Sequence, residues 1–196
     1  MTEKTKQHLR RYVVFAMGMI IDSIGIAFIT RAGLGTSPIS GIPFVLSLIL
    51  PPSIGTFTFL FNMVYIAAEA ILRKEFTKVQ AAQIPISLFF AVCIDAAMSI
   101  IPSQYGQFYL YSVAYLVIGC VIAAFAISLE VMADVIMLPA EALIRAISKK
   151  IGVRFGNVKI GFDTCLTIIA VVIALLSFHK LNGVREGTIF DALFVG

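Results

Sequence analysis

Acidic side chains stand inside several of the apolar runs of this sequence. Asp22 lies near the middle of the first run, Asp95 lies deep in the fourth, and Asp163 lies about one turn inside the last complete run. A charge at the centre of a membrane helix costs at least about 2.5–3.5 kcal/mol, so such acids usually face a cavity, a partner or a pathway. We predict that they relay protons or cations or balance a cationic substrate; a helix–helix hydrogen bond is the structural alternative.

A second candidate binding site is the glycine-rich segment after the first apolar run. Gly33 and Gly35 allow backbone conformations that are closed to other residues. Thr36 or Ser37 can cap a following helix, and Pro38 suits its first turn. A helix N-terminus inside a membrane offers free N–H groups and the positive end of the helix dipole to an anionic group. The structural alternative is a tight turn that lets two helices pack closely.

Further acids accompany a later short apolar run. Asp134 is predicted to be the N-cap of its helix. Glu141 precedes Arg145 by one turn, a spacing for an ion pair that would stabilise the helix or gate the inner side. Glu130 ends the fifth run and is placed at the membrane interface. The sequence contains no Walker A loop, GxSxG elbow, HExxH motif or CxxC pair, so we predict no enzyme, cofactor or metal site.

The composition indicates where these residues must be held. Of the 196 residues, 60% are hydrophobic and 13% are charged, and the mean hydropathy is +0.99. A soluble protein of this size could not bury so much apolar surface, so a soluble enzyme and a disordered chain are excluded. We predict an all-α polytopic membrane protein whose partners are the lipid bilayer and a small-molecule or ion substrate, not nucleic acid. The oligomeric state stays open, a homodimer included.

The apolar runs define the predicted helices. Five are long enough to cross a bilayer: Tyr12–Thr30, Gly55–Leu72, Val79–Ile101, Phe108–Leu129 and Ile160–Phe178. Two shorter runs, Pro38–Leu50 and Val135–Ile147, have 13 residues each. Thirteen helical residues rise only about 20 Å, which is too short to cross, so both are predicted to be re-entrant.

The distribution of basic residues favours this topology. If both short runs are re-entrant, twelve of the fifteen Lys and Arg residues fall on one side of the membrane. Only Arg31, Lys180 and Arg185 fall on the other side. The positive-inside rule assigns the richer side to the cytoplasm, which makes residues 1–11 a cytoplasmic segment.

The two halves of the chain show the same order of elements. Residues 12–101 contain a long run, a short run with a proline, and two long runs; residues 108–196 repeat this order, with the last long run only begun at residues 188–196. Three crossings per half is an odd number, so the second copy is predicted to be inverted, as in many secondary transporters. The alternative is that there is no repeat and that apolar hairpins resemble one another through composition alone.

The repeat also predicts a residue-by-residue register. Superposing the two short runs places Pro43 opposite Pro139. Superposing the long runs that follow them places Asn62 opposite Asp163. The two spacings differ by five residues, and the difference is assigned to the connecting loop. Asn62 thereby joins the candidate binding residues.

Three segments carry a family resemblance: AGLGTSPISGIPFVLS at residues 32–47, the later MADVIMLPAEAL, and the closing VREGTIFDALFVG. With them the whole chain resembles the bacterial YczE/YyaS/YitT family of integral membrane proteins, which is largely of unknown function. The resemblance implies a multi-pass protein of the bacterial inner membrane. Members usually complete a final helix after the closing motif, so the last helix is expected to be incomplete at Gly196.

Two functions are compatible with these features. The first is a secondary transporter or facilitator of a small solute, coupled to protons or a cation through the buried acids. The second is a non-transporting accessory or anchor for a partner enzyme. A cavity that reaches Asp22 and the tips of the short segments favours transport, whereas a dry, packed centre favours the accessory.

Overall fold

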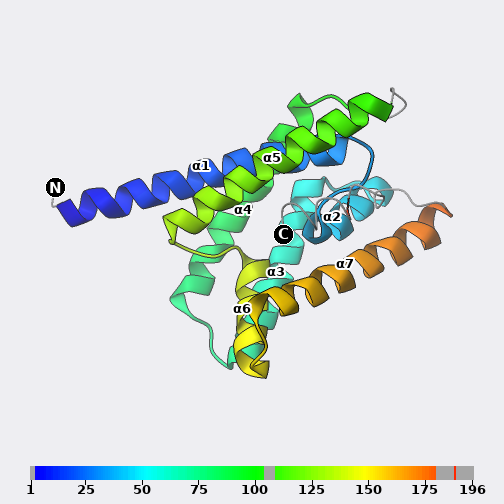
Figure 1. Cartoon of the computed structure of the whole chain (residues 1–196). Helices are drawn as coiled ribbons and strands as arrows, with labels where there is room; N and C mark the ends of the chain where they lie inside the picture. Colours follow the sequence, from blue (N-terminus) through cyan, green and yellow to red (C-terminus); the bar gives the residue numbers. More distant parts are fainter. Residues whose placement is uncertain (1–2, 104–108, 180–187, 189–196) are drawn as a thin grey trace.

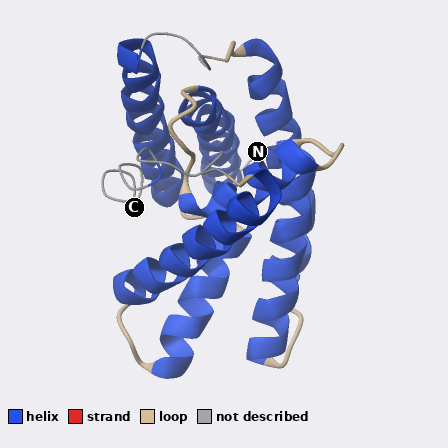
Figure 2. Cartoon of the chain, turned by 90° about the vertical axis from the view of Figure 1, so that its right-hand side faces the viewer, coloured by secondary structure: helices blue, strands red, loops and turns tan. Residues whose placement is uncertain are grey.

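The chain folds into helices joined by loops. The computed structural model describes residues 3–103, 109–179 and 188, and over these residues it contains seven helices and no strand (Figures 1 and 2). The helices are α1 (Glu3–Arg31), α2 (Pro38–Ile49), α3 (Ile54–Arg73), α4 (Lys78–Ile100), α5 (Tyr109–Ala133), α6 (Pro139–Ile151) and α7 (Phe155–Phe178). Apart from Thr188, the closing segment lies outside the described residues, and so does the expectation of an incomplete last helix.

Five of the helices are long and apolar enough to cross a membrane. They are α1 over Leu9–Arg31, α3, α4, α5 and α7, whereas α2 is a shorter apolar helix. Large apolar side chains cover the outside of the bundle, among them Ile71 and Ile100, each 78% exposed. An apolar exterior of this extent suits lipid and not water. The prediction of an all-α polytopic membrane protein is therefore confirmed.

Helix α1 packs closely against α5, and the two helices run in opposite directions (Figure 1). The contact depends on small residues. A Cβ atom on Gly25 would lie 2.8 Å from the backbone N of Ala123, and one on Gly119 would lie 2.8 Å from the backbone N of Ile29. Close helix approach through small residues is a common mode of packing in membranes.

The start of α6 differs from the prediction. Asp134 is not its N-cap: Asp134 follows the end of α5 with φ at 45°, and Leu138 occupies the N-cap position of α6. Pro139 takes the first helical position, where proline lacks only an N–H group that would have no intrahelical partner. This preference moves the start of the helix four residues beyond the predicted Val135.

The structure also corrects the register of the repeat. Helix α6 begins at Pro139, 101 residues after α2 begins at Pro38. Helix α7 begins 101 residues after α3 in the same way. Pro38, and not Pro43, is therefore the counterpart of Pro139, because Pro43 lies inside α2 and not at a helix start. The five-residue difference in spacing disappears, and the pairing of Asn62 with Asp163 fits the same 101-residue spacing.

The contacts between helices also come in pairs related by the 101-residue spacing. Helix α2 packs against α7 as α6 packs against α3, and α2 contacts α3 as α6 contacts α7. The loop before each short helix is held by the other half of the chain. The Thr36 N–H donates to the Thr188 hydroxyl at 3.2 Å, and the Gln83 side-chain amide donates to the Met137 carbonyl at 2.9 Å. Thr36 and Met137 are again 101 residues apart.

Candidate functional site

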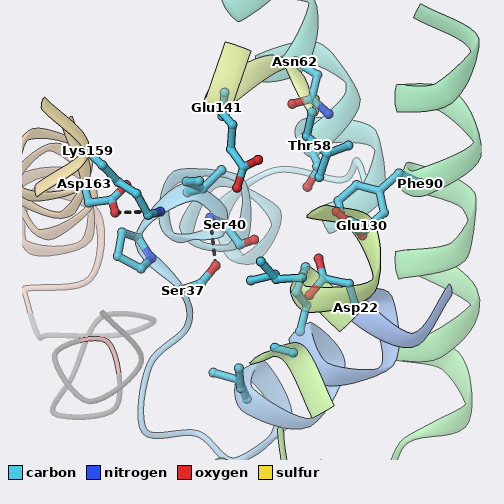
Figure 3. A pocket seen from close by; sticks show the side chains of 18 residues that line it. Asp22, Ser37, Ser40, Thr58, Asn62, Phe90, Glu130, Glu141, Lys159 and Asp163 are labelled. Atoms are coloured by element: carbon cyan, nitrogen blue, oxygen red, sulfur yellow. Dashed lines mark hydrogen bonds and ion pairs between the residues drawn. The ribbon is translucent and has the colours of Figure 1, made fainter. Parts of the chain in front are cut away.

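A cavity of about 110 Å³ lies between the two short helices and the five long ones (Figure 3). The N-terminal ends of α2 and α6 both border it. Its polar lining residues are Asp22, Ser37, Ser40, Thr58, Asn62, Glu130, Glu141, Lys159 and Asp163. Figure 3 shows Asp22 and Glu141 approaching the space from opposite sides.

The lining residues come almost entirely in pairs at the 101-residue spacing. The pairs are Asp22 with Ala123, Ile26 with Ile127, Ile29 with Glu130, Ser37 with Leu138, Ile39 with Ala140, Ser40 with Glu141, Thr58 with Lys159, and Asn62 with Asp163. Equivalent positions of the two copies thus face one space, so the cavity lies where the copies meet. The second copy supplies most of the charged groups, and the first copy supplies mainly neutral polar ones.

The cavity has a surplus of acidic groups. Four carboxyl groups line it with a single ammonium group, that of Lys159, which pairs with Asp163 at 3.2 Å. One carboxyl oxygen of Glu130 and one of Asp163 are buried without a hydrogen-bond partner. Asn62 is 5% exposed, and its side chain forms no hydrogen bond to another described residue. Buried polar groups are normally paired, so this lining calls for water, a proton or a solute.

Two cavity residues are not evident from the sequence. Glu130 is expected at the membrane interface, but α5 continues to Ala133 and therefore carries Glu130 into the bundle. Gly18 on α1 makes room for it, because a Cβ at that position would lie 2.8 Å from the Glu130 Cγ. Lys159 is expected in the inner basic loop, yet it lies on the first turns of α7, one turn before Asp163.

The glycine-rich segment adopts the backbone that its sequence predicts. Gly33 and Gly35 have φ values of 73° and 123°. Ser37 is the N-cap of α2 and accepts a hydrogen bond from the Ser40 N–H. Thr36 is fully buried, and its hydroxyl lies 3.0 Å from that of Thr30. Of the candidates in this segment, only Ser37 lines the cavity; Gly33, Gly35 and Thr36 lie in the buried loop that precedes it.

Asp95 lies away from the cavity and has a structural role. Its two carboxyl oxygens accept hydrogen bonds from the Gly55 N–H at 2.8 Å and the Ser53 hydroxyl at 2.6 Å. Both donors belong to the start of α3, so Asp95 stabilises that helix N-terminus. Of the two acids considered as companions of Asp22, the structure brings Asp163 to the cavity and not Asp95.

Of the two acids in the second short segment, Asp134 and Glu141, only one lines the cavity. The Asp134 side chain is 87% exposed and forms an ion pair with Arg11 at 2.9 Å. Glu141 faces the cavity (Figure 3). It does not form the expected ion pair with Arg145, whose guanidinium instead contacts the Met137 sulfur at 3.2 Å.

A larger hollow of about 540 Å³, which we term the vestibule, adjoins the cavity between α3, α4, α5 and α6. The two spaces share Ile127, Glu130, Leu138 and Glu141 as walls. The loop of residues 134–137 is partly exposed toward this side, whereas its counterpart at residues 33–36 is buried. The cavity is therefore bordered by an open hollow at one end and by buried chain at the other.

Comparison with known proteins adds a family but no activity. The family DUF6198, described as a family of unknown function, matches residues 9–196. No curated protein and no solved structure matches the chain.

Proposed function

The chain belongs to DUF6198, a family of unknown function, and we propose from its site that it is a secondary transporter or facilitator of a small solute. In this proposal it lies in the bacterial inner membrane with a cytoplasmic N-terminus, α2 and α6 are re-entrant, and the second copy is inverted. A relationship with the YczE/YyaS/YitT proteins forms part of the proposal. The observation that carries it is the acid-lined cavity where the two copies meet, joined to the vestibule.

The polarity of the cavity favours transport over a purely structural role. Four carboxyl groups inside a bundle of membrane helices would destabilise a protein that only anchors a partner. Proteins keep such groups where they face a solute pathway or a proton relay. The unpartnered oxygens of Glu130 and Asp163 and the free amide of Asn62 are then the groups that a solute or its hydration water meets.

The charge balance favours coupling to a proton or a cation. With every carboxyl group ionised, the cavity would hold four negative charges and the one positive charge of Lys159. Like charges in a small space of low dielectric constant repel strongly. Uptake of a proton or a cation relieves this repulsion, and its release restores it.

The repeat supports a means of alternating access. The vestibule lies beside the Asp134–Met137 loop, while the equivalent Gly33–Thr36 loop is buried. In this proposal the structure is the inward-facing state. In the outward-facing state the Gly33–Thr36 loop would be exposed and the Asp134–Met137 loop buried. Such an exchange of conformations between the two copies is the usual mechanism of inverted-repeat transporters.

Permeation through proteoliposomes tests the function with a panel of small charged solutes. Stopped-flow light scattering would follow reswelling after hyperosmotic addition of methylammonium chloride, γ-aminobutyrate or sodium lactate. We expect faster reswelling than in empty liposomes for at least one probe, lost in Asp22→Asn. Glu75→Gln is the matched control, since that exposed acid lies outside both the cavity and the vestibule and should permit normal flux. Reswelling equal to that of empty liposomes for every probe would favour the accessory role.

A further inference from the structure

Three deeply buried polar side chains face the vestibule, and each has one atom without a partner. Glu69, Gln80 and Gln83 are 3%, 1% and 1% exposed. One oxygen of Glu69 pairs with Arg73 at 2.7 Å, and the side-chain oxygen of Gln80 accepts from the Thr77 N–H at 2.8 Å. The other Glu69 oxygen, the Gln80 amide nitrogen and the Gln83 oxygen have no hydrogen-bond partner. Two acceptors and one donor are thus buried without a partner in residues of the vestibule wall.

Charged residues along α6 make one end of the vestibule acidic and the other end basic. Glu141, Arg145 and Lys149 follow one another at intervals of four residues, and all three line the vestibule. Residues four apart share one helix face, and the eight residues from Glu141 to Lys149 rise about 12 Å. Glu141 and Glu130 stand where the vestibule meets the cavity. Within the described part of the chain, Arg145 and Lys149 form no ion pair.

The other charged residues of the vestibule lining are paired, Glu69 with Arg73 and Asp134 with Arg11. The two ends of this hollow therefore favour opposite charges. A simple anion is attracted by Arg145 and Lys149 but repelled by the carboxyl groups at the cavity end. A simple cation meets the reverse arrangement. A solute that carries both charges is attracted at both ends when its ammonium group points toward the cavity.

We propose that the vestibule binds a zwitterionic solute with an ammonium and a carboxylate group, an ω-amino acid in its simplest form. Its ammonium group lies at Glu130 and Glu141, and its carboxylate lies at Arg145 and Lys149. Glu69, Gln80 and Gln83 supply hydrogen bonds to the polar groups or water between them. The acidic and basic side chains lie one to two helical turns apart, about 6–12 Å along α6. This spacing matches the separated charges of an ω-amino acid better than the adjacent charges of an α-amino acid. The inference rests on the proposed function, because it names the solute that the cavity would pass.

Ligand-induced thermal stabilisation of the purified full chain tests the binding site. The probes are glycine, β-alanine, γ-aminobutyrate and ε-aminocaproate, with butylamine and butyrate as single-charge controls. A ligand that binds the folded state raises the unfolding temperature by mass action. We expect the longer ω-amino acids to stabilise most, beyond the combined effect of the two controls. Equal stabilisation by butylamine, butyrate or glycine would overturn the proposal.

Matched variants locate the effect. Arg145→Gln and Glu141→Gln should each reduce the shift with γ-aminobutyrate to the level of a single-charge control. Lys150→Gln removes a positive charge from the same helix at a position outside the vestibule, so it should leave the shift intact. An undiminished shift in both Arg145→Gln and Glu141→Gln would reject the assigned contacts.

The outcome separates this inference from the proposed function. Stabilisation by γ-aminobutyrate without permeation of any probe would refute transport and leave the binding site in place. Permeation of methylammonium or lactate without stabilisation by any ω-amino acid would refute the binding site and leave transport in place.

Discussion

Asp22 is the residue on which the cavity chemistry depends most directly. It is 7% exposed and faces the cavity together with Glu130 and Glu141. Asp22→Asn preserves the shape of the side chain but removes its charge. We expect normal folding and expression, because the substitution is nearly isosteric, but loss of pH-dependent uptake. Circular dichroism would measure the folding, and reswelling of proteoliposomes at a series of pH values would measure the uptake. Unchanged pH-dependent uptake would remove Asp22 from the site.

Asp95 is expected to behave in the opposite way. Its carboxylate accepts hydrogen bonds from the Gly55 N–H and the Ser53 hydroxyl at the start of α3. Asp95→Asn replaces a charged acceptor by a neutral one, so we expect a loss of about 1 kcal/mol in the free energy of unfolding, the usual contribution of a capping group.

Flux separates this structural role from a functional one. The Asp95→Asn variant should transport normally once its lower stability is allowed for. Glu75→Gln, a change at an exposed acid between α3 and α4, serves as the control and should leave both quantities unchanged. A variant at Asp95 that folds with full stability yet loses flux would show that this acid belongs to the pathway.

At the scale of helices, local chemistry predicts much of the structure. Apolar run lengths predict all seven helices, and the cap at Ser37 follows from serine, proline and glycine preferences. The register of the repeat does not follow so easily, because two apolar segments can be superposed in several ways. The proline at the first position of each short helix is the signal that decides between them, and superposing Pro43 on Pro139 overlooks it.

The cavity is less predictable than the helices that form it. Asp22, Glu141 and Asp163 could be singled out because an acidic residue in an apolar run is conspicuous, and Asn62 because the predicted repeat pairs it with Asp163. Glu130 and Lys159 could not, because each lies near a predicted span end. Their burial depends on how far α5 and α7 continue and on how closely those helices pack, which is tertiary information.

The two equivalent glycines at the starts of α3 and α7 provide a test of helix packing. A Cβ on Gly55 would collide with the Ala91 carbonyl oxygen and lie 2.6 Å from the Asp95 carboxyl carbon, whereas one on Gly156 would meet nothing within 4 Å. We expect Gly55→Ala to lower the free energy of unfolding by about 1–3 kcal/mol through overpacking. Gly156→Ala should leave it unchanged or slightly higher. Similar unfolding midpoints for the two variants would contradict the close α3–α4 contact.

At the scale of the whole molecule, the proposed topology can be tested by cysteine labelling in intact cells. The background would replace Cys93, Cys120 and Cys165. We expect Lys74→Cys and Lys150→Cys to resist an impermeant maleimide until the cells are opened, because the basic residues lie inside.

Pro51→Cys, between α2 and α3, is the matched outer position and should be labelled in intact cells. Gln104 and Lys180, which the same rule assigns to the outer side, lie outside the described residues. Labelling of position 74 from outside would mean that α2 crosses the membrane, and the inverted repeat would then be wrong.

The central claim is that two copies of one structural unit enclose a hydrated cavity that a solute can reach. Reaction of Ag⁺ with Asn62→Cys tests this most directly, because a thiol there faces the cavity and Ag⁺ is small and cationic. The readout is loss of the thiol titre in folded, cysteine-substituted protein. Ala170→Cys, on α7 at a fully buried position in the contact with α2, is the control. We predict fast reaction at position 62 and none at position 170; an equally inert thiol at position 62 would mean a dry centre and contradict the account.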